Sequence, residues 1–182
     1  MDDLFSGTKA VDQKLRFDEQ GLHEWFSKNL SEFGSIEKIE QFKGGQSNPT
    51  YKITTANKKF VLRRKPPGKL LPSAHAVDRE YKVITALNST DVPVPRTFGL
   101  CEDENIIGTS FFVMEFLDGN IYWDLLLEDF NPKIRRAIYD SKNKVISSLH
   151  QVKFESIGLS DYGKHGNYVA RQVSTWTKQY LA

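Results

Sequence analysis

The sequence predicts an α+β fold, with five strands in the first part of the chain and helices alone in the second. Runs of alternating or continuous apolar residues, which are typical of strands, are confined to residues 35–118. Beyond residue 118, apolar residues recur at helical spacing instead. The predicted order is helix, three strands, helix, two strands and then helices, which indicates one α+β domain or two lobes.

The N-terminal part is predicted to hold a loose tail and one helix. Residues 1–16 are polar, and chain termini are commonly poorly ordered. Asp18 can cap a helix that runs to about Asn29, and Gly34 supplies a stop signal after it. The apolar residues of this helix fall near the helical period: Leu22, Trp25, Phe26 and Leu30.

A hairpin with two adjacent glycines, Gly44 and Gly45, follows this helix. Strand-like runs flank it on both sides, which is the pattern of a hairpin. Adjacent glycines can adopt positive φ and let the backbone approach a ligand closely, so the turn is a candidate phosphate cover. Ser47 and Asn48 add short hydrogen-bonding side chains to it. An ordinary hairpin turn remains the alternative, because short glycine motifs also occur without a ligand.

The next strand ends at Lys65, because Pro66-Pro67-Gly68 removes a backbone donor and fixes φ. A helix that Ser73 can cap then begins. Its apolar face consists of Val77, Tyr81, Ile84 and Leu87.

Glu80 falls on that apolar face, where an unpaired carboxylate would be very costly. Alternation along the preceding strand places Arg63 on one face with Val61, and Arg64 on the other face with Leu62. We therefore expect Arg63, and neither Arg64 nor Lys65, to pair with Glu80. The alternative is that Glu80 only borders the apolar face and is solvated.

The rest of the chain completes the predicted order. A connector at residues 91–95 leads to a short strand at 96–100, a turn at 106–108 and an apolar strand at 109–117. Asn131 and Pro132 form a good helix start. The predicted helices of this part are a short one at 121–128, a long one after Asn131 with its apolar face from Ile134 to Val152, and one from about Tyr168.

Composition excludes several classes of protein. The 182 residues are 39% hydrophobic and 26% charged, as in ordinary globular domains. A net charge of +2 is too small to argue for a nucleic-acid partner. The single Cys101 excludes an intrachain disulfide and fits a reducing compartment. No apolar run approaches the roughly 18 residues of a membrane span, and the first residues lack the features of a secretory signal.

Several stretches together resemble the aminoglycoside-phosphotransferase-like family of kinase-like proteins. They are most similar to the kinase-like domain that precedes the dehydrogenase in the acyl-CoA dehydrogenase fusion proteins, family members ten and eleven. The stretches are GQSNPT at 45–50, VLRRKPPG at 61–68, REY at 79–81, VME at 113–115 and RQVSTW at 171–176.

The resemblance implies a protein-kinase-like fold in three parts. Residues 1–34 would be a tail and helix, and residues 35–118 a small nucleotide-binding lobe with a five-stranded antiparallel sheet. Residues 119–182 would begin a helical large lobe and leave it incomplete.

The resemblance also implies ATP and Mg²⁺ as cofactors and assigns roles to residues. Arg63 would contact the phosphates in place of the usual lysine, and Glu80 would hold Arg63. Val61 would pack on adenine. The turn that covers the phosphates would consist of Gly44, Gly45, Gln46, Ser47 and Asn48, and the hinge that presents backbone groups to adenine would consist of Met114, Glu115 and Phe116.

The substrate implied by the resemblance is the hydroxyl of a 4-hydroxyacyl compound in fatty-acid catabolism, as a hydroxy acid or an acyl-CoA. A peroxisomal or mitochondrial location is implied in the same way. The family's His-Gly-Asp catalytic loop and its metal-binding Asp are missing, because His150 precedes Gln151 and His165-Gly166 precedes Asn167. We therefore predict no catalytic residue and no metal ligand in this chain, and no phosphate transfer by it alone.

Other functions remain open at this stage. The chain could be a non-catalytic, pseudokinase-like module that binds a nucleotide or a partner. A basic patch could instead bind an acidic group such as the phosphates of coenzyme A; it would consist of Arg63, Arg64, Lys65 and Lys69. The apolar stripe of the last helix also predicts self-association, and it consists of Val169, Val173, Trp176 and Tyr180.

Overall fold

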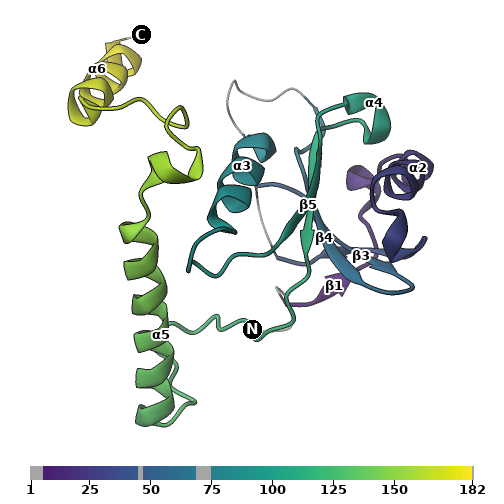
Figure 1. Ribbon diagram of the computed structural model, residues 1–182, viewed down its shortest axis with the longest axis horizontal. Helices are drawn as coiled ribbons and strands as arrows, with labels where there is room; N and C mark the ends of the chain where they lie inside the picture. The colour runs from purple at the N-terminus through teal and green to yellow at the C-terminus, as the bar shows by residue number, and fades with distance from the viewer. Residues whose placement is uncertain (1–5, 45–46, 69–74, 182) are drawn as a thin grey trace.

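The fold is built on one antiparallel sheet of six strands in the order β1-β2-β3-β4-β6-β5 (Figure 1). The computed structural model describes residues 6–44, 47–68 and 75–181. The strands are β1 (Thr8–Lys9), β2 (Ile36–Phe42), β3 (Thr50–Thr55), β4 (Lys59–Arg64), β5 (Thr97–Cys101) and β6 (Phe111–Glu115).

The helices α2 (Glu19–Asn29) and α3 (Val77–Leu87) lie on opposite faces of this sheet (Figure 1). The predicted cap of α2 is confirmed, because the Asp18 carboxylate accepts a hydrogen bond from the Gly21 backbone N–H. Leu22 and Phe26 of α2 are buried against the sheet, in a core cluster that includes Tyr51, Ile53, Phe60 and Leu62. On the other face, the ring of Tyr81 from α3 meets the ring of Phe112 from β6.

Two predictions for the N-terminal half are wrong in detail. The tail is not loose throughout: β1 pairs with β2, with Thr8 opposite Phe42, and the 3₁₀ helix η1 (Gln13–Leu15) follows it. The sheet therefore has six strands instead of five. The helix α3 has Ala76 at its N-cap position, with no side-chain cap. The proposed cap Ser73 lies outside the described residues.

Two further differences concern the second half. The turn predicted at 106–108 is the end of a one-turn helix, α4 (Glu104–Ile107), which Asp103 caps and Gly108 ends in the left-handed conformation. This turn contacts α2 so closely that a Cβ on Gly21 would lie 2.2 Å from the Ile106 carbonyl oxygen. The helix predicted at 121–128 does not form, and Asp124 instead accepts two backbone hydrogen bonds, from Leu126 and Glu128.

Arg64 is buried inside the sheet face that carries α2, with 2% of its surface exposed. Its guanidinium donates hydrogen bonds to the carbonyl oxygens of Leu15 and Ile107, each at 3.3 Å. These residues end η1 and α4, so both carbonyls belong to the set that a helix leaves unpaired at its C-terminus. The guanidinium also lies 5.1 Å from the ring centroid of Phe17 and 5.8 Å from that of Tyr51. Arg64 thus joins the N-terminal segment to the α4 turn.

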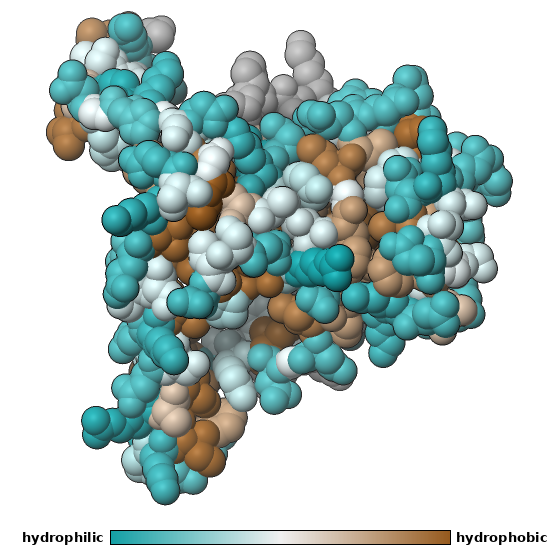
Figure 2. Space-filling view, in the orientation of Figure 1, coloured by the Kyte–Doolittle hydropathy of each residue, from teal (hydrophilic) through white to brown (hydrophobic). Residues whose placement is uncertain are grey.

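The second part consists of α5 (Pro132–Gln151), the 3₁₀ helix η3 (Phe154–Ile157) and α6 (Tyr168–Leu181), as predicted for α5 and α6. Asn131 caps α5 through the Ile134 backbone N–H. Neither α5 nor α6 has a buried residue, and Figure 2 shows hydrophobic residues gathered along the column formed by α5. Trp176 and Tyr180 of α6 are 66% and 90% exposed. Self-association through α6 stays a prediction. Within the described part of the chain, no helix could cross a membrane.

The outer side of α3 is tied to the segment that follows η3. The Lys82 ammonium lies 2.7 Å from the Asp161 carboxylate, and the Arg79 guanidinium donates to the Tyr162 carbonyl at 2.8 Å. The hydrogen bond and charge of Lys82 lower the pKa of Asp161 below its ordinary value of 3.8.

We expect acid to loosen this attachment. A carboxyl group whose pKa is lowered by folding stabilises the fold above its unfolded pKa, and this contribution is lost as the pH falls through the lowered folded pKa. Backbone amide NMR shifts of α3 should therefore change below about pH 4. The change should be absent in Asp161→Asn. The same transition in that variant would assign it to another group.

Candidate functional site

The predicted ion pair between Arg63 and Glu80 is confirmed. The Arg63 Nε donates to Glu80 Oε2 at 2.6 Å, and Nη2 lies 3.5 Å from Oε1. The side chains are 28% and 36% exposed, so the pair is partly open to solvent. Alternation along β4 produces this arrangement, because it directs Arg63 toward α3 and Arg64 toward α2.

The guanidinium of Arg63 retains donors for a ligand. Arginine has five N–H donors. Besides the two bonds to Glu80, Nη1 donates to Thr50 Oγ1 at 3.2 Å. Two N–H groups are left without a partner among the described residues. A guanidinium held on one side by a carboxylate, with free donors on the other, is suited to a phosphate oxygen.

The glycine hairpin connects β2 and β3 beside this pair. Gly44 is half-buried and Ser47 is exposed, whereas Asn48 is 3% exposed. The Asn48 Nδ2 donates to Glu80 Oε1 at 2.9 Å. Its side chain therefore supports Glu80 instead of facing outward with Ser47. The predicted residues Gly45 and Gln46 lie outside the described residues.

His75, which the sequence analysis did not single out, completes the group. Its Nδ1 lies 2.8 Å from Asn48 Oδ1, directly before the start of α3. Asn48 and His75 are 27 residues apart in the chain, and no periodicity connects them. The only sequence signal was the polar Asn48 beside the glycines.

The predicted hinge lies where β6 ends, beside Val61 of β4, which pairs with Met114. The Glu115 backbone N–H donates to the Arg96 carbonyl at 2.8 Å, so this donor is already used. For Phe116, no backbone hydrogen bond is found within the described residues. An unpaired backbone edge of this kind requires water or a ligand. Docking of adenine at this edge stays a prediction.

The sheet face beside this edge carries an unexpected cation. Lys52 lies directly opposite Val61 on β3, so both side chains point to the same face. The Lys52 ammonium is 5.5 Å from the centroid of the Phe116 ring and 3.7 Å from the Glu40 carboxylate. The Phe116 ring stacks on Phe42 with centroids 6.3 Å apart. Aromatic rings and Val61 thus provide an apolar surface next to the hinge.

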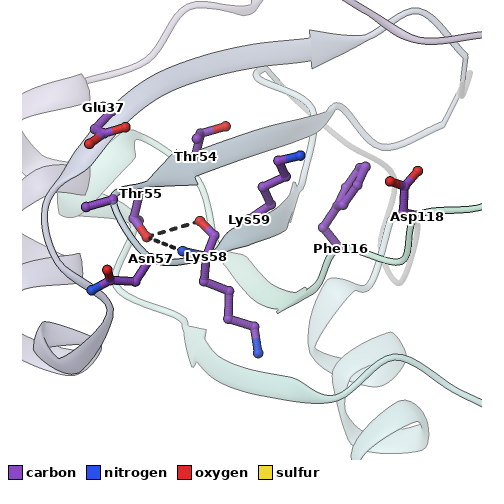
Figure 3. Close-up of a pocket in the computed structure, with 9 residues that line it drawn as sticks. Glu37, Thr54, Thr55, Asn57, Lys58, Lys59, Phe116 and Asp118 are labelled. Atoms are coloured by element: carbon purple, nitrogen blue, oxygen red, sulfur yellow. Dashed lines mark hydrogen bonds between the residues drawn. The ribbon is translucent and has the colours of Figure 1, made fainter.

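A hollow of about 570 Å³ opens between the β3–β4 turn and the segment after β6. Figure 3 shows Thr55 and Asn57 on one side of it and Phe116 and Asp118 on the other. Hydrogen bonds between Thr55 and Lys58 hold the turn. Arg63 is not among its lining residues, so this hollow is separate from the Arg63–Glu80 pair.

The structure argues against the basic patch. Arg64 is buried and lies on the opposite face of β4 from Arg63, so the four residues do not form one open cationic surface. Lys69 lies outside the described residues. For metal ions, no group of three or more His, Cys, Asp or Glu side chains able to hold one occurs in the described part of the chain.

Comparison with known proteins agrees with this geometry. A profile of the phosphotransferase enzyme family matches residues 38–182. The chain is 47% identical to a candidate aminoglycoside phosphotransferase from Ralstonia eutropha of known crystal structure, with a TM-score of 0.77, and the match covers 91% of this chain and 48% of that one. The kinase-like α+β fold is therefore confirmed.

Similar curated proteins are longer. Acyl-CoA dehydrogenase family member 10 of Mus musculus is 51% identical over 177 residues, which is 96% of this chain and 16% of that protein. "Probable acyl-CoA dehydrogenase IBR3" of Arabidopsis thaliana is 49% identical over 92% of this chain and 21% of its own length. Acyl-CoA dehydrogenase family member 11 of Homo sapiens is 43% identical over 92% of this chain and 22% of its own length. The chain spans about a fifth of these relatives, and it belongs to the phosphotransferase enzyme family.

Proposed function

We propose that this chain is the ATP-binding part of a small-molecule phosphotransferase. The observation that carries the proposal is the Arg63–Glu80 pair at 2.6 Å, next to the glycine hairpin and with two guanidinium N–H groups left for a ligand. Phosphoryl transfer depends mainly on positioning and on neutralising the charge of the phosphates. Arg63 would bind a phosphate oxygen, and the backbone of the hairpin would cover the phosphates. Val61 and the hinge would hold adenine.

The residues fit the phosphates of ATP better than they fit Mg²⁺. Bound Mg²⁺ would neutralise phosphate charge, but Glu80 is committed to Arg63 and Asn48, and the described residues hold no carboxylate cluster. We therefore assign no Mg²⁺ ligand to this chain. We also propose that it does not supply the catalytic base, so that it binds nucleotide without transferring phosphate by itself.

The acceptor follows only from the relatives. Their names place similar sequences in acyl-CoA dehydrogenases. We propose that the whole protein phosphorylates the hydroxyl of a 4-hydroxyacyl compound, in fatty-acid catabolism. The match to the phosphotransferase enzyme family favours a phosphotransferase as the whole protein over the alternative, a non-catalytic nucleotide- or partner-binding module.

The proposal predicts that filling the surface beside the hinge blocks nucleotide binding. Val61→Trp should weaken binding of a fluorescent ATP analogue in the presence of Mg²⁺ by at least about tenfold, because a bulky ring would occupy the space for adenine. The measurement is a fluorescence titration of the purified chain, with unlabelled ATP as competitor.

Thr54→Trp is the matched control. Thr54 lies on the same face of the sheet but at the turn end of β3, opposite Lys59. It should leave the affinity close to that of the unsubstituted chain. If the unsubstituted chain binds no nucleotide, or if both variants weaken binding equally, the proposed function is wrong for this surface.

A further inference from the structure

We propose that Asn48 and His75 are positioning residues that hold Glu80, and through it Arg63, in the phosphate-binding geometry. The inference rests on the proposed function. Four side chains form one line of hydrogen bonds: His75 to Asn48 at 2.8 Å, Asn48 to Glu80 at 2.9 Å, and Glu80 to Arg63 at 2.6 Å. This line joins three separate parts of the fold, which are the glycine hairpin, the start of α3 and the strand β4.

The direction of each hydrogen bond follows from the chemistry of the partners. An ionised carboxylate only accepts hydrogen bonds, so Glu80 requires the Nδ2 of Asn48 to face it. The Oδ1 of Asn48 then faces His75 and can only accept, so His75 must carry a hydrogen on Nδ1. Asn48 is 3% exposed, and its amide is satisfied on both sides by these two partners. The arrangement therefore has one consistent pattern of donors and acceptors.

The backbone at His75 shows that this position is constrained. Its φ is +57°, a left-handed conformation that residues other than glycine rarely adopt. Such strain persists where the surroundings compensate for it. Its carbonyl accepts from the Val77 N–H at 2.9 Å, at a helix start that has no side-chain cap. The hydrogen bond to Asn48 is the side-chain contact that accompanies this conformation.

The line restrains what Arg63 can do. Asn48 donates to Glu80 Oε1, which also lies 3.5 Å from Arg63 Nη2, while Oε2 accepts the short bond from Arg63 Nε. Without Asn48, Glu80 could rotate toward solvent, since its side chain is 36% exposed. Arg63 would then lose its orientation, and its free N–H groups would no longer point in one fixed direction. We expect nucleotide affinity to fall although neither Asn48 nor His75 need touch the nucleotide.

The first test needs no nucleotide. A long-range ¹H–¹⁵N NMR spectrum of the imidazole should show His75 with its hydrogen on Nδ1. In Asn48→Ala this preference should be lost, because the acceptor for that hydrogen is gone. A neutral His75 protonated on Nε2 in the unsubstituted chain, or a tautomer that does not respond to Asn48→Ala, would overturn the proposal.

The second test separates the hydrogen bond from the backbone strain. Asparagine at position 75 tolerates positive φ and places an amide N–H where the imidazole has Nδ1, whereas glycine tolerates the same φ and offers no donor. In the fluorescence titration with Mg²⁺ and an ATP analogue, His75→Asn should bind within about threefold of the unsubstituted chain. His75→Gly should bind about tenfold more weakly, which corresponds to one lost hydrogen bond.

Thr85→Val is the control on the same helix, because it removes the 2.8 Å hydrogen bond from α3 to Thr97 of β5. It should not change the affinity. Equal affinity of His75→Gly and the unsubstituted chain, or equal weakness of His75→Asn and His75→Gly, would overturn the positioning role. If the unsubstituted chain binds no nucleotide, the proposed function fails and the positioning role fails with it, while the NMR spectrum still decides whether the hydrogen-bond line exists.

Discussion

Arg64→Ala should lower the free energy of unfolding by about 3 kcal/mol, since it removes charged hydrogen bonds worth about 1.5–3 kcal/mol and leaves a cavity. The side chain is 2% exposed and bridges the carbonyls of Leu15 and Ile107. The substitution also removes the contacts of the guanidinium with the rings of Phe17 and Tyr51. Burial raises the pKa of the neighbouring Tyr51 phenol.

Urea denaturation followed by fluorescence would measure this loss. Arg64→Lys should recover only part of it, because an ammonium cannot reach two separated carbonyls as the planar guanidinium does. Arg63→Ala, at the preceding residue, is the matched control. The side chains of Arg63 and Glu80 are about one third exposed, so this variant should lose about 1 kcal/mol or less in its free energy of unfolding. A loss below about 1 kcal/mol in Arg64→Ala would mean that the cost of burying the charge cancels its contacts.

For nucleotide binding we expect the opposite order, with Arg63 important and Arg64 not. Arg63→Ala is expected to weaken the affinity for ATP with Mg²⁺ by about tenfold to a hundredfold, the equivalent of one charge-assisted hydrogen bond to a phosphate. In the unsubstituted chain, the free N–H groups of Arg63 would supply that bond. In Arg63→Ala, Glu80 would also be left without its cation.

Isothermal titration calorimetry would measure the affinity, and ADP and AMP would show which phosphate is involved. Arg63→Lys should restore part of the binding, since it restores the charge without the fork of donors. For Arg64→Ala, the affinity should change little at temperatures where the variant is folded. Unchanged affinity in Arg63→Ala would remove the main support for the proposed function.

The Arg63–Glu80 pair could be predicted because two regular periods define it. Alternation along β4 separates Arg63 from Arg64, and helical spacing places Glu80 on the apolar face of α3. Element types in the long, strongly periodic segments were predicted for the same reason, as with α2, α5 and α6. The errors fell on short segments whose structure depends on distant partners. The strand β1 has two residues, too few for a periodic signal, and pairs with β2, which lies far along the chain.

The remaining differences have a similar cause. Residues 121–128 have helical composition, but Asp124 binds the backbone of the next residues and favours a turn. The line from His75 through Asn48 could not be predicted either. Two loop residues meet only once the hairpin and the start of α3 are placed in three dimensions, and neither position lies on a periodic face.

The contacts of Arg64 also determine how long a segment must be transferred when a chimera is made between this chain and a related protein. The family profile begins at residue 38, yet the carbonyl of Leu15, the ring of Phe17 and the strand β1 all lie before it. A chimera joined at residue 38 would leave the edge of β2 open and the guanidinium with half of its acceptors. Grafts that also carry residues 6–37 keep Arg64 together with the carbonyl groups that accept its hydrogen bonds. They should be expressed as folded protein, whereas shorter grafts should aggregate through the open edge of β2.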